Sequence, residues 1–385
     1  MTIMPTVVRD THRLLRSSGE LKPGRAVITT VIALGLGALS LLAVLVFHYP
    51  QYLTTPDIRK MYPVELLRHL LFGALLVAGV LSVVNLVRGR RRSLNALALG
   101  LVAVAVAWGG SAVPVGDFPK HTPYLGLDWF IIDLLLSGLM FVAIEKAVPL
   151  DKAKAVFRRA WQTDMAHFAM THFFVGLSVV AVNFLIFNVL GWLQSDTVHA
   201  FVGGIPFVPQ VVLCILVADL AEYWTHRAYH EVPVLWKFHS VHHSTETMDW
   251  LAGSRLHLFE VVTTRVLVLT PLYLLGFNQA VLNTYIVIVG FWGVFIHANV
   301  RVPWGPLRHV VVTPDFHHWH HSSDDEAIDK NYAGQFAFLD YLFGTSVKSD
   351  KQFPENYGVL GNYMPDGFIR QQLFPFHRLL AARAG

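Results

Sequence analysis

Long apolar stretches separated by short polar segments dominate this chain from residue 27 onward. A helix needs about 20 apolar residues to cross a bilayer. Eight stretches approach that length, and the last two are joined by the break Gly276-Phe277-Asn278, which predicts a tight hairpin. The pattern therefore predicts membrane-spanning helices at roughly residues 27–47, 64–87, 94–113, 127–148, 171–193, 208–225, 262–276 and 280–299.

The composition supports a membrane protein and excludes several other classes. Of the 385 residues, 54% are apolar and only 15% are charged, whereas about 25% are charged in a typical soluble domain. The single cysteine, Cys214, excludes disulfide frameworks and thiolate metal sites. The net charge of +4 comes from basic residues gathered between apolar stretches. This distribution indicates membrane topology and not a nucleic-acid-binding surface.

Histidine is unusually concentrated in one part of the chain. Twelve of the 20 histidines lie between residues 226 and 321, in clusters spaced HxxxH, HxxHH and HxxHH. Separations of three and four place side chains on one face of a helix, so each cluster can aim two or three imidazoles at one point. One ion takes only about four to six ligands, so the clusters predict two metal ions. The predicted ligands are His226, His230, His239, His242, His243, His317, His320 and His321.

Other polar residues near these clusters extend the predicted site. His297 ends a long apolar stretch, where an unbound histidine is costly, and it ranks above His257 as a further ligand. Asp219 lies two helical turns before His226 and is expected to accept the second ring proton of a ligand histidine. Glu260 is expected to orient a neighbouring histidine. The residues expected to support and close the site are Asn299, Asn331 and Asp340. His318 would point about 100° away from His317 on a helix, so we exclude it as a ligand.

The basic residues also predict which side of the membrane carries the clusters. They concentrate in the arm 1–26, in 88–92 and in 146–159, and alternating helices place these segments on one side. An excess of Lys and Arg marks that side as cytoplasmic. Continued alternation brings all three histidine clusters to the same side. We therefore expect a multi-pass protein of a bacterial inner membrane, with its metal site facing the cytoplasm.

Taken together, the motifs resemble the fatty acid hydroxylase / sterol desaturase superfamily of membrane di-iron oxygenases. They are, in order, HRxxH, HxxHH, RLHxxE, the FIHAN stretch, TPDFHxxHH, NYxG and DYLFGT, over roughly residues 205–346. The resemblance implies two histidine-bound iron ions that activate O₂, a lipid substrate from the bilayer, and an external electron donor of the cytochrome or ferredoxin type. It carries the ligand roles onto the eight clustered histidines, with His297 and His257 completing the set. One departure is Leu339, where the family often has an aromatic residue before its closing aspartate.

We therefore expect a membrane-bound di-iron oxygenase that hydroxylates, or alternatively desaturates, a lipid such as a fatty acyl chain or a sterol. Zinc can take the same ligands in a purified sample, but it has no redox role. A metal transporter would need ionisable groups through the bilayer depth, and a zinc hydrolase usually has three protein ligands. A non-catalytic metal-binding membrane protein would hold ions without O₂-dependent turnover.

The expected fold is all-α, a polytopic membrane helical bundle with a cytoplasmic helical cap that holds the histidine-rich di-metal site. The tail ends in an amphipathic stretch, 368–383, which we expect to lie against the membrane or the cap. The expected domains are a basic arm (1–26), a four-span membrane region (27–150), a connecting region with the fifth span (151–204), the di-iron domain (205–346) and a C-terminal tail (347–385).

Overall fold

The protein is helical throughout the part of the chain that its structure covers. The computed structural model describes residues 25–116, 126–349, 351–361 and 363–381, so nearly all of the predicted basic arm lies outside it. Helices make up most of these ranges, which contain no strand, only the isolated bridges Pro149–Val300 and Ser322–Tyr357. The all-α prediction is therefore confirmed. The α-helices are α2 (Arg25–His48), α3 (Pro50–Leu53), α4 (Pro56–Arg59), α5 (Val64–Val87), α6 (Arg92–Ala107), α7 (Leu127–Ala147), α8 (Trp161–Leu185), α9 (Asp196–Gly203), α10 (Phe207–Glu231), α11 (Pro233–His243), α12 (Leu258–Leu275), α13 (Gln279–Phe295), α14 (Pro314–His320), α15 (Phe338–Phe343) and α16 (Phe368–Ala381).

Six helices among the described residues are long and apolar enough to cross a membrane, as a multi-pass membrane protein requires. Their apolar side chains are largely exposed: Leu135, Leu136 and Leu139 of α7 are 60–75% exposed, as expected of a surface that faces lipid. The six stretches are Thr29–His48, Val64–Val87, Arg92–Ala112, Leu127–Ala147, Phe207–Glu231 and Leu258–Leu275.

Two of the eight predicted spans are not in this set. The prediction at 171–193 falls on α8, which begins ten residues earlier, at Trp161, and carries the buried polar residues Asp164 and His167 in its first turns. The last prediction falls on α13, which has only 17 residues. At about 1.5 Å per residue it is roughly 26 Å long, which is shorter than the hydrocarbon core of a bilayer.

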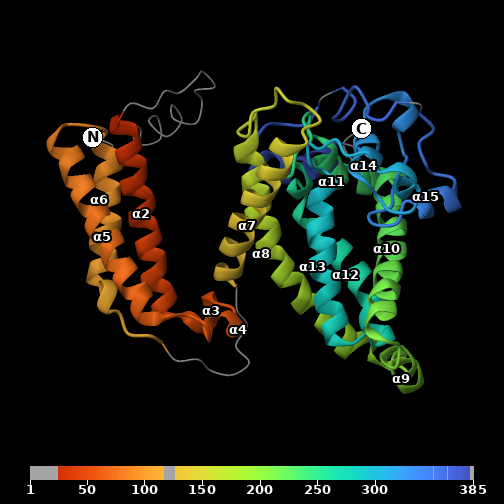
Figure 1. The fold of residues 1–385 in the computed structure, drawn as a ribbon, viewed down its shortest axis with the longest axis horizontal. Coiled ribbons are helices and arrows are strands. Elements are labelled where there is room, and N and C mark those ends of the chain that lie inside the picture. The colour runs from red at the N-terminus through yellow and green to blue at the C-terminus, as the bar shows by residue number, and fades with distance from the viewer. Residues whose placement is uncertain (1–24, 117–125, 350, 362, 382–385) are drawn as a thin grey trace. The chain divides into compact units, whose positions relative to one another are not determined.

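The chain divides into two compact units, Met1–Leu134 and Leu135–Gly385. In the first unit, α2, α5 and α6 pack side by side around a small apolar core (Figure 1). Its members are Val44, Phe47, Leu71, Leu75, Ala78, Val102, Ala105 and Val113. Among its buried polar side chains, Asn95 accepts a hydrogen bond from the side-chain amide of Asn85 (3.2 Å) and donates one to the hydroxyl of Thr30 (3.0 Å). This unit contains none of the predicted site residues.

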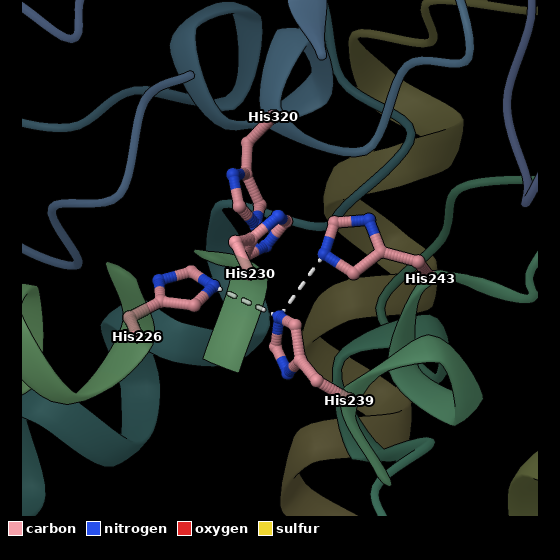
Figure 2. A group of neighbouring side chains, drawn as sticks. All are labelled: His226, His230, His239, His243 and His320. Atoms are coloured by element: carbon pink, nitrogen blue, oxygen red, sulfur yellow. Dashed lines mark hydrogen bonds between the residues drawn. The ribbon is translucent and has the colours of Figure 1, made fainter. Parts of the chain in front are cut away.

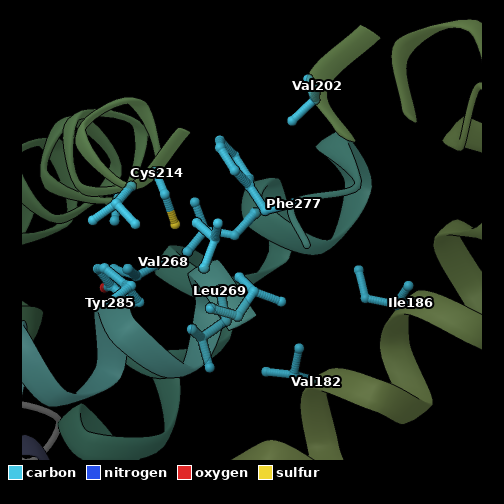
Figure 3. Packing of buried hydrophobic residues seen from close by; sticks show 13 residues of the cluster. Val182, Ile186, Val202, Cys214, Val268, Leu269, Phe277 and Tyr285 are labelled. Atoms are coloured by element: carbon cyan, nitrogen blue, oxygen red, sulfur yellow. The ribbon is translucent and has the colours of Figure 1, made fainter. Parts of the chain in front are cut away.

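The second unit is built around an apolar core between α10, α12 and α13, with α8 beside them (Figure 3). The hairpin predicted at Gly276 is confirmed: α12 ends there, and Gly276 has φ 74° and ψ 36°. A Cβ at this position would lie 2.5 Å from the ring of His199 in α9, so only glycine fits. The core residues include Cys214, Ala218, Val268, Leu269, Leu272, Val281, Leu282 and Tyr285.

The two ends of this second unit differ in character. One end holds α9, the start of α10 and the α12–α13 turn, and the other holds α11, α14, α15 and the C-terminal segment (Figure 1). Helix α16 packs on α11 and α8, and Gln371 bonds the buried ring of His167 at 2.8 Å. The predicted amphipathic tail thus has one face against the histidine-bearing end of the unit.

Candidate metal centre

Four structural elements present the predicted histidines at one end of the second unit. The end of α10 carries His226 and His230, and α11 carries the second cluster. His297 follows α13, and the third cluster lies on α14 and its C-terminal cap residue His321. Together these elements bring nine of the ten predicted ligands into two groups.

The first group collects five imidazoles from α10, α11 and α14 (Figure 2). Their ligand atoms all lie within 4.8 Å of one another. The Nε2 atom of His239 is 3.1 Å from Nε2 of His226 and 3.1 Å from Nε2 of His243. The members are His226, His230, His239, His243 and His320, and we call them group one.

The second group collects four imidazoles and is fully buried. Nε2 of His297 lies 3.0 Å from Nε2 of His317, 3.1 Å from that of His321 and 3.3 Å from that of His242. The Nε2 atoms of His317 and His321 are 3.1 Å apart. These four residues, His242, His297, His317 and His321, are group two.

These nitrogen–nitrogen distances are those of ligands around one ion. With metal–nitrogen bonds of about 2.1 Å, neighbouring ligands are roughly 3.0 Å apart in an octahedral site and about 3.4 Å apart in a tetrahedral site. The observed distances of 3.0–3.3 Å lie in this range. Each group therefore has the size and donor type of a site for a borderline transition metal.

The other ring nitrogens show which tautomer is present. A backbone carbonyl only accepts hydrogen bonds, so an Nδ1 that contacts one must carry the proton, which leaves the lone pair on Nε2. Nε2 is the atom that faces the group centre. The Nδ1 contacts are His226 to Tyr332 O (2.7 Å), His320 to Lys330 O (2.8 Å), His242 to Arg255 O (3.1 Å), His297 to Gly293 O (2.6 Å), His239 to Glu260 Oε1 (2.7 Å) and His230 to Asp329 Oδ1 (3.2 Å).

Burial keeps these rings neutral. Desolvation lowers the pKa of His297 to about 4. Desolvation, with neighbouring histidines as the next cause, lowers the pKa of the α11 and α14 histidines in both groups well below the usual value. Neutral rings whose lone pairs face one another at about 3 Å repel unless a cation lies between them. The arrangement therefore fits two metal ions and does not fit protonated histidines.

Helix geometry explains how the clusters divide between the groups. Residues four apart on a helix differ by about 40° in direction, whereas residues three apart differ by about 60° to the other side. His239 and His243 both join group one, while His242 points to group two. His317 and His321 both join group two, while His320 points to group one. Each HxxHH motif therefore supplies ligands to both groups.

The prediction that His257 is a ligand is wrong for this structure, because His257 lies in neither group. Its Nδ1 accepts a hydrogen bond from the backbone N–H of Phe259 and so caps the start of α12. Its Nε2 bonds the carbonyl of Gln372 in α16 at 2.9 Å. Both ring nitrogens are thus engaged with backbone. His318, which the sequence excluded, likewise bonds Tyr357 and the carbonyl of Ala298.

Among the five predicted supporting residues, Glu260 is the one whose side chain makes a hydrogen bond, 2.7 Å long, to a ligand histidine, His239. Asp219 has a different role from the one expected: it accepts hydrogen bonds from the backbone N–H groups of residues 334–336 at 2.6–3.1 Å. Asp340 accepts from the N–H groups of Tyr332 and Ala333. The two carboxylates fix the loop whose Tyr332 carbonyl holds His226. They act on the site through this loop.

The two predicted asparagines also act on backbone. The side chain of Asn299 bonds the backbone N–H and carbonyl of Asp151. Asn331, at φ 57°, donates to the carbonyl of Phe316 and accepts from the N–H of Val347. Neither side chain contacts a histidine of either group through a hydrogen bond that the described residues make. Both hold segments that flank α14 and the end of α13.

Sequence reasoning missed a network of buried charges that supports group two. Arg255, whose carbonyl accepts from His242, pairs with Asp164 at 2.6 Å. Arg158 bridges Asp164 (2.7 Å) and Asp249 (2.6 Å). The sequence does show five charged residues near apolar stretches. It does not show which of them pair, because the pairs join segments about 90 residues apart. The fifth charged residue of this network is Lys154, which lies 3.7 Å from Asp249.

A cavity of about 290 Å³ reaches group one. Three of its wall residues are ligand candidates, His230, His243 and His320. The ring of Trp236 stands over two of them, 5.1 Å from the ring of His230 and 5.4 Å from that of His243. The other wall residues are Ser322, Ala327, Ile328, Asp329, Gly358, Val359, Leu360 and Tyr363.

Comparison with known proteins agrees with the motifs. The chain is 29% identical to the ornithine lipid hydroxylase OlsE of Rhizobium tropici over 255 residues, 66% of this chain and 77% of that protein. It is 28% identical to the alkylglycerol monooxygenase of Danio rerio over 221 residues, and it spans only 48% of that protein. It is 24% identical to methylsterol monooxygenase 2-2 of Arabidopsis thaliana over 54% of this chain and 80% of that protein. No solved structure gave a match. Residues 211–345 match the model of the fatty acid hydroxylase family, so this segment is similar to that family.

Proposed function

We propose that this chain is a membrane-bound oxygenase that hydroxylates a lipid with O₂ and electrons from an external donor. The observation that carries the proposal is the convergence of nine neutral histidines into two buried groups at the end of apolar helices. The names of similar proteins support it, because they are hydroxylases or monooxygenases of lipids and sterols. We favour hydroxylation over desaturation for the same reason.

The metal is the next part of the proposal. Group one would hold one ion with five nitrogens, and group two would hold a second with four. Iron is the metal that we propose, because reducing O₂ requires a redox-active ion and zinc has no redox role. When bound, two iron ions would supply the reductive activation of O₂. A zinc hydrolase usually uses three protein ligands, which two groups of this size exceed.

The residues of the chain bind, orient and shield this centre. The Nδ1 contacts fix six rings in the tautomer that a metal needs. Burial of group two excludes bulk water. In the proposed reaction, a C–H bond breaks and a C–O bond forms. One oxygen atom of O₂ enters the lipid and the other leaves as water, with two electrons from a cytochrome- or ferredoxin-type donor and two protons from solvent.

We also propose where this site lies. Residues 205–346 would form the di-iron domain, and the end of the second unit that carries the histidines would face the cytoplasm. The support is the concentration of Lys and Arg in segments that alternating helices place on that side. Labelling of single introduced cysteines in intact cells, at Leu342 beside the site and at Gln194 at the other end, would test it. Gln194 alone should react with an impermeant reagent.

The function is tested by anaerobic reconstitution of the full chain with ferrous iron in a native lipid extract, followed by O₂ and reductant. We expect two irons per chain and lipid products heavier by one oxygen. His242→Ala and His320→Ala remove one ligand from each group and should abolish product and lower the metal content. His309→Ala is the matched control, because His309 is exposed, lies outside both groups, and its ring bonds Tyr341 within the described part of the chain. One metal per chain, or two metals without O₂ uptake, would contradict the oxygenase proposal.

A further inference from the structure

The depth of the metal groups along the apolar helices limits which part of a bilayer lipid can reach them. Helix α10 begins at Phe207, and His226 follows 19 residues later. At about 1.5 Å per residue this is roughly 29 Å, close to the ~30 Å thickness of the hydrocarbon core of a bilayer. A helix that enters the core at Phe207 therefore leaves it at the first ligand.

Two other helices have one end beside the same groups. Helix α12 begins at Leu258, and Glu260 in its first turn bonds His239 of group one. Helix α13 ends at Phe295, and His297 of group two follows two residues later. The three helices run in alternating directions, so both groups lie at one end of this helix set. If α10 crosses the hydrocarbon core from Phe207, the groups lie at the boundary between hydrocarbon and headgroups.

The walls of the cavity at group one come mostly from outside the apolar helices. Apart from His230 at the end of α10, its walls come from α11, from α14 and from the segments after α14, none of which is a candidate span. Its volume of about 290 Å³ is at the lower limit of the ~300–1,000 Å³ typical of small-molecule pockets. The cavity can therefore take a headgroup-sized part of a lipid but not a whole lipid.

We propose that the bond oxidised by this protein lies in the polar third of its lipid substrate. This third comprises the headgroup, the linkage to the chains and the carbons directly beside that linkage. In the bilayer these atoms already lie at the level of the groups, and they enter through the cavity between Trp236 and Leu360. Carbons farther along a chain lie in the hydrocarbon core and would have to leave it. The inference rests on the proposed function and specifies the position of attack.

The first test locates the added oxygen. The iron-loaded full chain in vesicles of native lipid is supplied with ¹⁸O₂ and reductant, and tandem mass spectrometry assigns the ¹⁸O to a fragment of each product. We expect the label in headgroup or linkage fragments, or within three carbons of the linkage. Label in the middle or at the end of a chain would overturn the inference while leaving the oxygenase proposal intact. No ¹⁸O in any lipid would instead count against the oxygenase proposal.

The second test needs no turnover. Anaerobic protein loaded with Co²⁺ is mixed with phospholipid vesicles, and NMR relaxation of the ³¹P headgroup signal is compared with that of the terminal chain methyl. Zn²⁺-loaded protein is the diamagnetic reference. We expect Co²⁺ to accelerate ³¹P relaxation several-fold more than methyl relaxation. A stronger effect on the methyl would place chain ends at the metal and refute the inference.

The third test concerns the entry path. Leu360→Trp should obstruct the cavity, lowering product formation at least ten-fold while both metals stay bound. Leu342→Trp adds the same side chain at an exposed position of α15 that does not line the cavity. It should keep normal turnover. Unchanged turnover in Leu360→Trp, with metals bound, would exclude this cavity as the path.

Discussion

Replacing Glu260 by Gln changes one carboxylate that touches a ligand and leaves every ligand in place. Glu260 Oε1 accepts from Nδ1 of His239 at 2.7 Å, and Glu260 is only 5% exposed. A buried anion behind a ligand raises the basicity of the ring and offsets the charge of the ion. Its Oε2 has no hydrogen-bond partner among the described residues. The glutamine NH₂ would replace an oxygen that receives no hydrogen bond from the described residues.

Two effects of this substitution can be separated by size. Loss of such a contact typically weakens metal binding ten- to a hundred-fold, which is about 1.4–2.8 kcal/mol. Burying the unpaired NH₂ costs about 1–3 kcal/mol in folding. The first effect should be confined to group one, because Glu260 contacts none of the rings of group two through a hydrogen bond. We therefore expect the affinity of one of the two metal-binding steps to fall and the affinity of the other to remain unchanged.

Anaerobic competition between the protein and a chelator, with bound metal counted at each step, measures this outcome. His242→Ala identifies the step that belongs to group two. Glu231→Gln is the control, because Glu231 lies on α10 beside His230 but pairs with Arg227. Equal weakening of both steps would mean that Glu260 supports only the fold. No change in either step would refute the argument that its charge tunes the metal.

Three further predictions use other parts of the site. In Gly253→Ala the new Cβ would lie 2.8 Å from Nδ1 of His297. We expect at least ten-fold weaker metal binding at group two alone, measured by competition with a chelator. Unchanged competition would contradict the close packing of Gly253 on His297. His257→Ala removes the cap on Phe259 and the contact to Gln372. The loss of about 0.5–2 kcal/mol of folding stability should lower the thermal midpoint by a few degrees, while two metals remain bound. Loss of a metal in this variant would show that His257 is a ligand after all. Burial lowers the pKa of His297 to about 4, so the unfolded chain takes up protons first as the pH falls below about 6.5. The metal-free protein should lose up to ~1.4 kcal/mol of stability per pH unit and per such histidine between pH 6.5 and 4, with no loss from them above pH 6.5; unfolding curves that do not depend on pH would contradict this.

The sequence was sufficient for the histidine set because helix periodicity is local. Spacings of three and four report which side chains share a face, and the elements that carry the clusters are helices. The same pattern could not predict which histidines of different clusters share a metal group. That His320 joins His226 and that His321 joins His297 depends on how α14 packs against α10 and α13. Contacts of this kind join residues far apart in the sequence.

The supporting residues show where local reasoning ends. Asp219 lies on the expected side of α10, but its partners are backbone N–H groups about 115 residues later. His257 stands in a motif with Glu260, but it lies at the point where α12 starts, so its ring caps that helix. Gln372, which holds the other side of this ring, belongs to the tail. In each case a backbone group took the place of the side-chain partner that the motif suggested.

The two groups also connect the elements that form this end of the protein. Group one joins α10, α11 and α14, and group two joins α11, α14 and the turn after α13. In the absence of an ion, the neutral rings of His226 and His239, or of His242 and His297, would direct lone pairs at one another across 3.1–3.3 Å. Metal binding therefore removes a repulsion that folding alone creates, and binding and folding must be coupled. Removal of the metal should loosen α11 and α14 in hydrogen exchange while the core between α10, α12 and α13 stays protected. Equal loosening of both regions would mean that the ions stabilise the whole unit, and no loosening would mean that the packing of the helices alone holds the rings together.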